Sequence, residues 1–281
     1  MDTNEIGSAR WLPAGTFEGR VCVVTGGGTG LGLEISRGLA ELGAKVVVTS
    51  RNPEHHTALL SEAERRGWCV RSLECDVREP ERVAATAKAV LDEFGVVDIL
   101  VNNAAGNFVC PAERLSSNAW RSVLGIVLDG TFYCSRAFGK PMLKRGEGQI
   151  FNIVATYAWT GMPGVVHSAS AKAGVLAMTK TLASEWADRG VRVNAIAPGP
   201  FESSGARGNL WPTEEIKARL EQQIPLGRFG DVDEVAAHCL YLLSPASAYI
   251  TGECLTVDGG ASLAPPMWEK GSRPKRKREP Q

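Results

Sequence analysis

A glycine-rich segment near the amino terminus constrains the fold of this 281-residue chain more than any other feature. Thr25–Gly32 reads TGGGTGLG, directly after an apolar run and at the start of a helical pattern. Gly26 and Gly30 let the backbone turn tightly and come close to a phosphate. The unpaired N–H groups at the start of the following helix then bind that phosphate. This order of strand, glycine loop and helix predicts an open α/β sheet that binds a dinucleotide at its edge.

Short apolar runs alternate with helical patterns along nearly the whole chain. In Val46–Val48 the apolar residues are consecutive, which is typical of a strand buried on both faces of a parallel sheet. Between such runs the apolar residues recur with the helical period, as at Ile35, Leu39 and Leu42. The expected strands are Val21–Thr25, Lys45–Thr49, Val70–Cys75, Ile99–Val101, Gln149–Val154, Arg192–Ala197 and Cys254–Val257. We therefore predict a doubly wound Rossmann fold with a seven-stranded parallel sheet.

This fold is expected to form a single domain over residues 17–264, between a flexible arm (1–16) and a basic, disordered tail (265–281). The tail contains Arg273–Glu279, read RPKRKRE. Nucleic-acid contact or nuclear import is one interpretation of such a run, but its short length and terminal position favour a solvated tail. The long predicted helices Asn118–Lys144 and Ser168–Arg189 carry apolar residues on more than one face, which predicts subunit contacts.

Composition argues against several kinds of partner. The chain is 44% hydrophobic with a formal net charge of zero, so nothing global predicts binding to nucleic acid or to a membrane surface. The seven cysteines form no CxxC pair and the four histidines show no ligand spacing, so no metal site is expected. No apolar run approaches the ~20 residues that span a bilayer. With no signal peptide and no peroxisomal address, a cytoplasmic location is expected.

The end of the second strand predicts which nicotinamide cofactor binds. An acid at this position would hydrogen-bond the ribose hydroxyl of NAD. Here the strand runs out as Thr49, Ser50 and Arg51, with no acid before Glu54. A guanidinium suits a 2′-phosphate because its planar donors match phosphate geometry. We therefore expect NADPH rather than NADH.

Other strand ends supply the rest of the expected cofactor site, since ligands of open α/β sheets bind where strands end. Asp76 is placed to hydrogen-bond the adenine amino group, and small residues in Asn102–Gly106 (NNAAG) leave room for the cofactor. The residues expected to contact it are Thr25, Gly26, Gly27, Gly28, Thr29, Gly30, Leu31, Gly32, Ser50, Arg51, Asp76, Val77, Asn103, Ala104, Ala105, Pro198, Gly199, Pro200 and Phe201.

Taken together, these motifs resemble those of the short-chain dehydrogenase/reductase superfamily, over roughly Gly19–Gly260. The superfamily motifs present are TGxxxGxG at Thr25–Gly32, the NNAG-like Asn102–Gly106, Lys172, the PG turn at Pro198–Gly199 and DGG at Asp258–Gly260. The superfamily's usual catalytic Tyr, four residues before the lysine, is replaced here by Ser168. A serine hydroxyl is a far weaker acid than a phenol and is a poor proton donor for ketone reduction.

Four further segments narrow the resemblance to the NADPH-dependent 2,4-dienoyl-CoA reductases of mitochondria and peroxisomes, which also lack that Tyr. They are Asn102–Phe108 (NNAAGNF), Glu113–Trp120 (ERLSSNAW), Ile153–Gly161 (IVATYAWTG) and Ser168–Gly174 (SASAKAG). The resemblance implies that Tyr157 is catalytic with Asn107 as its partner, that Lys172 holds the nicotinamide ribose, and that Ser168 supports the site by hydrogen bonding. It further implies acyl-CoA contacts at Phe108, Ser116 and Arg78, a homotetramer, and a place in unsaturated fatty-acid β-oxidation.

The chemistry of this family agrees with the residues. Hydride transfer to C5 of a dienoyl thioester spreads negative charge over a dienolate, as far as the thioester oxygen. That oxygen needs two neutral donors more than a strong acid, and Tyr157 and Asn107 can supply them. By the family's pattern the α carbon is then protonated, with water as the expected source, which gives a trans-3-enoyl-CoA.

The chain also departs from the family patterns. Ala155 falls at the superfamily's active-site serine, and Asp129 stands where an asparagine is usual, so that an ionised Asp129 could pair with Lys172. The CoA-contacting Arg of the family is replaced by Asn209, for which Arg207 is the expected substitute. His167 borders the site, either as a ligand or as an ordinary surface histidine.

Three other functions remain open. A trans-2-enoyl-CoA reductase would receive hydride at C3 instead of C5. A non-catalytic NADPH-binding protein would fit the loss of the usual Ser and Tyr. Ordinary ketone reduction, for example of 3-oxoacyl groups, is disfavoured by Ala155 and Ser168.

Overall fold

Seven parallel strands form one sheet in the order β3-β2-β1-β4-β5-β6-β7. The structure is a computed structural model that describes residues 11–202 and 213–263. The strands are β1 (Val21–Thr25), β2 (Lys45–Ser50), β3 (Val70–Glu74), β4 (Ile99–Asn102), β5 (Gly148–Ile153), β6 (Val191–Pro198) and β7 (Cys254–Val257). The predicted doubly wound sheet is confirmed. Every predicted strand is present, and no end differs by more than one residue; β3, for example, stops at Glu74 instead of Cys75.

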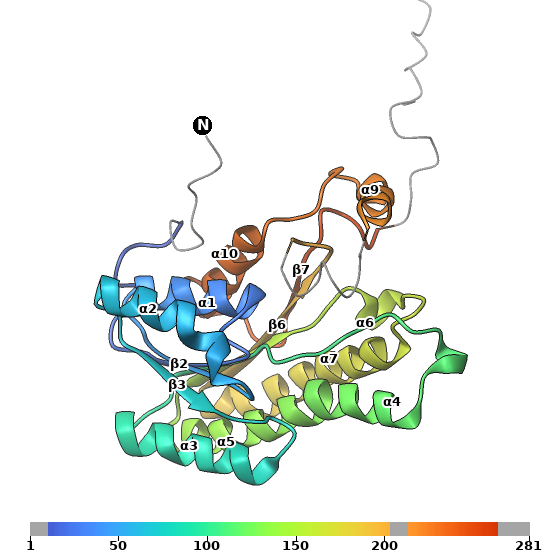
Figure 1. The fold of residues 1–281 in the computed structure, drawn as a ribbon. Helices are drawn as coiled ribbons and strands as arrows, with labels where there is room; N and C mark the ends of the chain where they lie inside the picture. Colours follow the sequence, from blue (N-terminus) through green and yellow to red (C-terminus); the bar gives the residue numbers. More distant parts are fainter. Residues whose placement is uncertain (1–10, 203–212, 264–281) are drawn as a thin grey trace, which may run out of the picture.

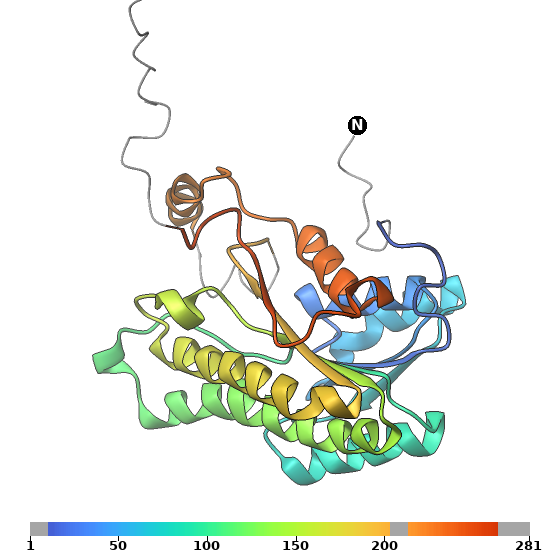
Figure 2. The same ribbon diagram turned by 180° about the vertical axis from the view of Figure 1, so that it is seen from behind.

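Helices cover both faces of the sheet, so the fold has three layers (Figure 1). One face carries α1 (Gly30–Glu41), α2 (Thr57–Arg66) and α10 (Val232–Leu243). The other carries α3 (Pro80–Phe94), α4 (Ser117–Leu124), α5 (Gly130–Arg145) and α7 (Val166–Trp186). Figure 2 shows the same layers from behind, with the sheet between the two groups. The short α6 (Tyr157–Thr160) follows β5, and α9 (Glu214–Gln223) precedes α10.

The consecutive valines that predicted a buried sheet divide between two cores. Val46 and Val48 pack with α1 and α10 on one face, whereas Val47 packs with α3 and α5 on the other. Successive side chains of a strand point to opposite faces, so only a strand covered on both sides buries an unbroken apolar run. All three valines are fully buried.

The strand order reverses between β1 and β4, which lie side by side at the centre of the sheet. From β1 the chain adds β2 and then β3 on one side of the sheet. From β4 it adds β5, β6 and β7 on the other side. Loops at the carboxyl ends of β1 and β4 therefore diverge and leave a crevice between them, which is where ligands bind in such folds.

The prediction of one long helix over Asn118–Lys144 is wrong in one respect, because the helix in this region is not a uniform α-helix. A π-helical turn, Gly125–Asp129, interrupts it between α4 and α5. Apolar periodicity does not report such a turn, which adds one residue within otherwise continuous helix. The second long helix was predicted as Ser168–Arg189; α7 begins two residues earlier and ends in the 3-10 turn Ala187–Arg189.

None of the helices in the described parts of the chain is both long and apolar enough to cross a membrane. Arg207, Asn209, the first ten residues of the predicted arm and the predicted basic tail lie outside the described residues. Three further 3-10 turns are Pro53–His56, Ala112–Arg114 and Pro245–Ser247.

Candidate active site

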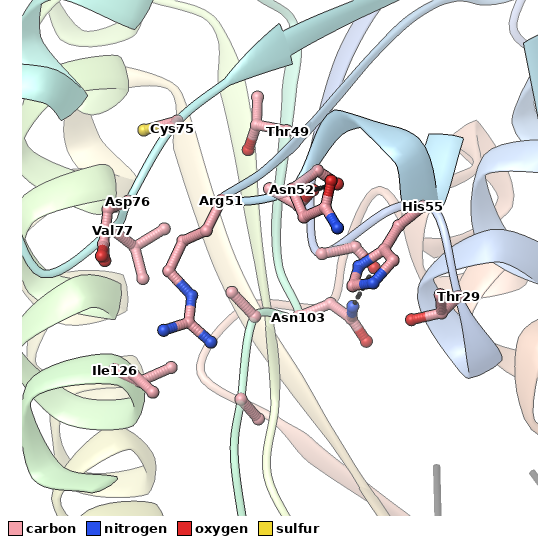
Figure 3. A pocket seen from close by; sticks show the side chains of 14 residues that line it. Thr29, Thr49, Arg51, Asn52, His55, Cys75, Asp76, Val77, Asn103 and Ile126 are labelled. Atoms are coloured by element: carbon pink, nitrogen blue, oxygen red, sulfur yellow. Dashed lines mark hydrogen bonds between the residues drawn. The ribbon is translucent and has the colours of Figure 1, made fainter. Parts of the chain in front are cut away.

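A pocket of about 460 Å³ lies at the carboxyl ends of β1, β2, β3 and β4 (Figure 3). The predicted residues that line it are Gly26, Thr29, Ser50, Arg51, Asp76, Val77, Asn103, Ala104 and Ala105. These segments are far apart in the sequence. Their proximity was predicted only because the carboxyl ends of parallel strands lie at one edge of a sheet. Sequence reasoning missed Thr49, Asn52, His55, Cys75 and Ile126, which also line the pocket.

The glycine loop has the shape that a pyrophosphate requires. Gly26 and Gly30 have positive φ, +64° and +52°, a region that other residues rarely adopt. A Cβ on Gly32 would lie 2.3 Å from the Gly26 carbonyl oxygen and 2.4 Å from the Asn103 Nδ2. Only glycine therefore allows the loop to pack this closely, and Thr29, the residue before α1, lines the pocket. The described residues fit a dinucleotide phosphate at this position.

Hydrogen bonds join this loop to the end of β4. Thr25 is buried, and its hydroxyl accepts the backbone N–H groups of Asn103 and Ala104, both at 3.0 Å. The Asn103 side chain donates to the carbonyl oxygens of Thr25 and Gly26, again at 3.0 Å. Thr25 and Asn103 thus hold the crevice in shape, a role that the glycine pattern alone did not indicate.

The end of β2 presents a cation to the pocket. Figure 3 shows the Arg51 guanidinium extending across it toward Ile126 and Asn103. Ser50 donates to the Asn52 carbonyl oxygen at 2.7 Å, which shapes the turn after the strand. His55 lines the pocket from the following 3-10 turn. No carboxylate of the β2 end lines this pocket in the part of the chain that the structure describes.

Asp76 and Arg78, which were predicted to contact different ligands, bind each other. The Arg78 Nε lies 2.9 and 3.0 Å from the two carboxylate oxygens of Asp76, and its Nη2 lies 2.5 Å from one of them. These hydrogen bonds are the main reason that the pKa of Asp76 is below its ordinary value. Asp76 is therefore an ionised acceptor at the edge of the pocket, with Arg78 fixed beside it.

The remaining residues expected at the cofactor do not line this pocket. Gly27, Gly28, Gly30, Leu31 and Gly32 form the glycine loop and the first turn of α1. Pro198, Gly199, Pro200 and Phe201 lie at the end of β6, where the Gly199 N–H donates to the Val257 carbonyl at 2.9 Å. Phe201 packs against the core shared by α1 and α10.

Tyr157, Asn107 and Ser168 come together on the other side of the crevice. Tyr157 is the first residue of α6, directly after the end of β5. Its hydroxyl oxygen lies 3.4 Å from the Asn107 Nδ2 and 3.0 Å from the Ser168 Oγ. The Asn107 Oδ1 accepts the Phe108 N–H at 2.9 Å, which fixes the amide with its NH₂ group toward the phenol. One loop and two helices thus bring these three residues together at the Tyr157 hydroxyl.

The environment keeps the Tyr157 phenol neutral. Burial raises its pKa above the ordinary value, and the hydrogen bonds from Ser168 and Asn107 oppose that shift only in part. Ala155, two residues after the end of β5, is buried and brings no hydroxyl to the site. Tyr157 is therefore an O–H donor at neutral pH and not a phenolate.

Lys172 lies one helical turn after Ser168, on the same face of α7. Its Nζ donates to the Ile153 carbonyl oxygen at the end of β5. Burial lowers its pKa to about 8. The pairing with Asp129 that the sequence allowed is absent from the described residues: Asp129 is exposed at the end of the π-helical turn, and the Lys172 pKa is set by burial and not by a nearby carboxylate. The Lys172 ammonium therefore has no acidic partner among the described residues.

His167 is not a surface residue, contrary to one of the two expectations for it. Its side chain is fully buried, and its ring stacks on Phe108 with centroids 4.5 Å apart and a tilt of 31°. Phe108 itself packs against the cluster between α4 and α7. Ser116, predicted to contact the substrate, caps α4 by accepting the Ala119 N–H at 3.2 Å.

The chain is similar to a known protein family and to several curated proteins. A family model described as enoyl-(acyl carrier protein) reductase matches residues 26–262. The chain is 45% identical over 251 residues to a probable 2,4-dienoyl-CoA reductase of Bacillus subtilis described as (2E)-enoyl-CoA-producing; the match covers 89% of this chain and 99% of that protein. It is 42% identical to the peroxisomal 2,4-dienoyl-CoA reductase of Danio rerio, described as (3E)-enoyl-CoA-producing, covering 87% and 82%.

A crystal structure of a short-chain dehydrogenase from Bacillus anthracis is similar throughout. Its sequence identity to this chain is 47% and its TM-score is 0.80, and the match covers 89% of this chain and 99% of that one.

Proposed function

This chain belongs to the short-chain dehydrogenase/reductase family of oxidoreductases, and we propose that it reduces 2,4-dienoyl-CoA thioesters with NADPH. The main support for this proposal is that Asn107 and Ser168 both form hydrogen bonds to the Tyr157 hydroxyl. The relatives named as 2,4-dienoyl-CoA reductases support the same substrate class. In this role the protein removes conjugated double bonds during the β-oxidation of unsaturated fatty acids.

The Tyr157 oxygen has two lone pairs, and Asn107 and Ser168 can occupy both of them as donors. The phenolic O–H is then free to donate to a substrate. The Asn107 amide has a second N–H that makes no hydrogen bond within the described residues. Two neutral donors can therefore converge on one thioester oxygen and stabilise the negative charge that develops there.

NADPH supplies the hydride that C5 of the substrate accepts. On the protein side, the glycine loop and the start of α1 are suited to the pyrophosphate, Arg51 and Ser50 to the 2′-phosphate, and Asp76 to the adenine. Lys172 is held at the end of β5 by its hydrogen bond to the Ile153 carbonyl oxygen. From this position it would bind the nicotinamide ribose, and Tyr157 would face the thioester. Ala155 leaves the site without the second hydroxyl that ketone reduction uses, so the donor pair suits an enolate better than an alkoxide.

A substrate comparison tests this function directly. NADPH absorbance followed with 2,4-hexadienoyl-CoA and with 2-hexenoyl-CoA should show turnover of the dienoyl thioester at least about tenfold faster. A trans-3-enoyl-CoA product would support protonation at the α carbon, as proposed, whereas a trans-2-enoyl-CoA would place the proton at C4. The two named relatives differ in this respect, so the product must be identified by its double-bond position.

A trans-2-enoyl-CoA reductase is the second candidate. The description of the matching family model, an enoyl reductase, favours it. Preferential turnover of 2-hexenoyl-CoA would establish this reading and overturn the first one. Binding of NADPH without turnover of either thioester would instead indicate a non-catalytic protein.

Removing the Arg51 side chain tests the choice of cofactor. Arg51→Ala should weaken NADPH binding by about tenfold to 10²-fold, because a charge-assisted contact to phosphate is worth roughly 1.5–3 kcal/mol. NADH has no 2′-phosphate, so its dissociation constant should change by less than about twofold. Fluorescence titration of both cofactors measures the effect, and an unchanged NADPH affinity would refute the assignment.

We also propose a homotetramer. Large apolar side chains stay exposed on the helices that cover the sheet, among them Phe132 on α5 and Tyr241 on α10. Such surface suits subunit contact. Solution scattering that gave the mass of a single chain would contradict it.

A further inference from the structure

Two separate segments form hydrogen bonds to the Tyr157 hydroxyl. In each segment the residue adjacent to the hydrogen-bonding one contacts the other segment. Asn107 comes from the loop after β4 and Ser168 from the first turn of α7. Phe108 follows Asn107, His167 precedes Ser168, and the two rings stack at 4.5 Å. The stack therefore lies one residue away from both hydrogen bonds to the phenol.

A backbone contact joins the same two segments farther from the phenol. The Cys110 N–H donates to the Gly164 carbonyl at 2.8 Å. A Cβ on Gly164, whose φ is +83°, would lie 2.9 Å from the Val109 Cγ1. The loop after β4 thus packs closely against the turn before α7, and the ring stack continues this contact up to Tyr157.

His167 is an unusual choice for such a packing position. No described residue makes a hydrogen bond of normal geometry to either ring nitrogen, although the side chain is fully buried. A buried polar group without a partner is destabilising. Burial lowers the pKa of His167, with the Phe108 backbone acting in the opposite direction. The ring is consequently neutral at pH 7 and acts as a flat aromatic surface.

We propose that His167 is a positioning residue: its stack on Phe108 sets the separation between Asn107 and Ser168 and so fixes the direction of the Tyr157 hydroxyl. Its effect on turnover rests on the proposed function, but its effect on Tyr157 does not. The important feature is the ring and not its nitrogens, since neither nitrogen makes a hydrogen bond of normal geometry within the described residues. An aromatic replacement should therefore preserve the arrangement, whereas removal of the ring should disturb it.

The first measurement needs no substrate. With tyrosine labelled at Cζ with carbon-13, the protein gives signals from four tyrosines, and the Tyr157 signal is the one lost in Tyr157→Phe. His167→Ala should shift this signal, because the hydrogen bonds at the phenol oxygen change. Phe108→Ala, which removes the other ring, should shift it in the same direction, whereas His167→Phe should leave it close to its wild-type position.

The second measurement is kinetic. At saturating NADPH, His167→Ala should lower kcat for the dienoyl thioester by about tenfold to 10²-fold, the order expected when a reacting group moves by about 1 Å. The dissociation constant of NADPH should stay within about twofold, since His167 does not line the cofactor pocket. His167→Phe should retain kcat within about threefold.

Val175→Ala is the matched control, a buried residue of the same helix and of the cluster beside Phe108. It should lower thermal stability without moving the Tyr157 signal or kcat. An unmoved Tyr157 signal in both His167→Ala and Phe108→Ala overturns the inference, and so does a His167→Phe protein as impaired as His167→Ala. A wild type that reduces neither thioester contradicts the proposed function alone, because the carbon-13 signals still report on the stack.

Discussion

Tyr157→Phe is expected to lower kcat for 2,4-dienoyl-CoA by about 10²–10³-fold, the usual loss when one donor to a developing oxyanion is removed. The phenylalanine ring fills the same space, so only the hydroxyl is lost. That hydroxyl is the point at which Asn107 and Ser168 meet. Its raised pKa means that a neutral donor, and not a phenolate, is removed over the whole range near pH 7. Steady-state rates at saturating NADPH measure the loss.

Two observations separate this loss from a general defect. NADPH affinity should be unchanged, since Tyr157 does not line the cofactor pocket. Tyr249→Phe, a change of the same kind at a fully exposed side chain, should leave kcat unaltered. A Tyr157→Phe enzyme with full activity would falsify the assigned role.

The sheet and the pocket at its carboxyl edge were predictable from the sequence because they depend on regular patterns. An unbroken apolar run such as Val46–Val48 is stable only between two helix layers. Several of the seven strand segments show this pattern, and their alternation with helical segments indicates the architecture. The pocket follows from the sheet, since residues that end parallel strands meet at one edge whatever their separation in the chain. Arg51 and Asp76 reached the same pocket for this reason.

The parts that the sequence did not predict depend on side-chain partners and local helix geometry. Asp129 was placed near Lys172 by its position in the chain, but the π-helical turn that ends at Asp129 leaves it on the solvent side. Asp76 and Arg78 each have a charge that could bind a ligand, and two residues of separation allow them to bind each other. His167 could not be assigned to the interior because its ring pairs with Phe108, a residue 59 positions earlier that is not adjacent in any pattern.

Lys172→Met should make the protein more stable and much less active. The folded-state pKa of Lys172 is about 8, below the ordinary value of 10.5, so the folded protein binds fewer protons than the unfolded chain between these two values. Stability therefore rises with pH in this window, and the full cost of the buried ammonium, about 3 kcal/mol, is present below pH 8. Methionine has no charge to bury but loses the bond to the Ile153 carbonyl, worth about 1 kcal/mol. The expected net gain in unfolding free energy at pH 7 is roughly 2 kcal/mol.

Urea unfolding of both proteins at pH 7 and above pH 10.5 tests the sign, because the gain must vanish at high pH, where the lysine is neutral in the folded and unfolded states alike. Activity should change in the opposite direction: kcat/KM falls by about 10²-fold at pH 7 when the nicotinamide ribose is no longer held in place. In the wild type, kcat/KM should decline as the pH rises through about 8 and the ammonium loses its proton. Lys180→Met, an exposed change on the same helix, should show neither effect. A Lys172→Met protein that is less stable at pH 7 would mean that the ammonium is solvated or paired in solution, and its role at the cofactor would have to be reassigned.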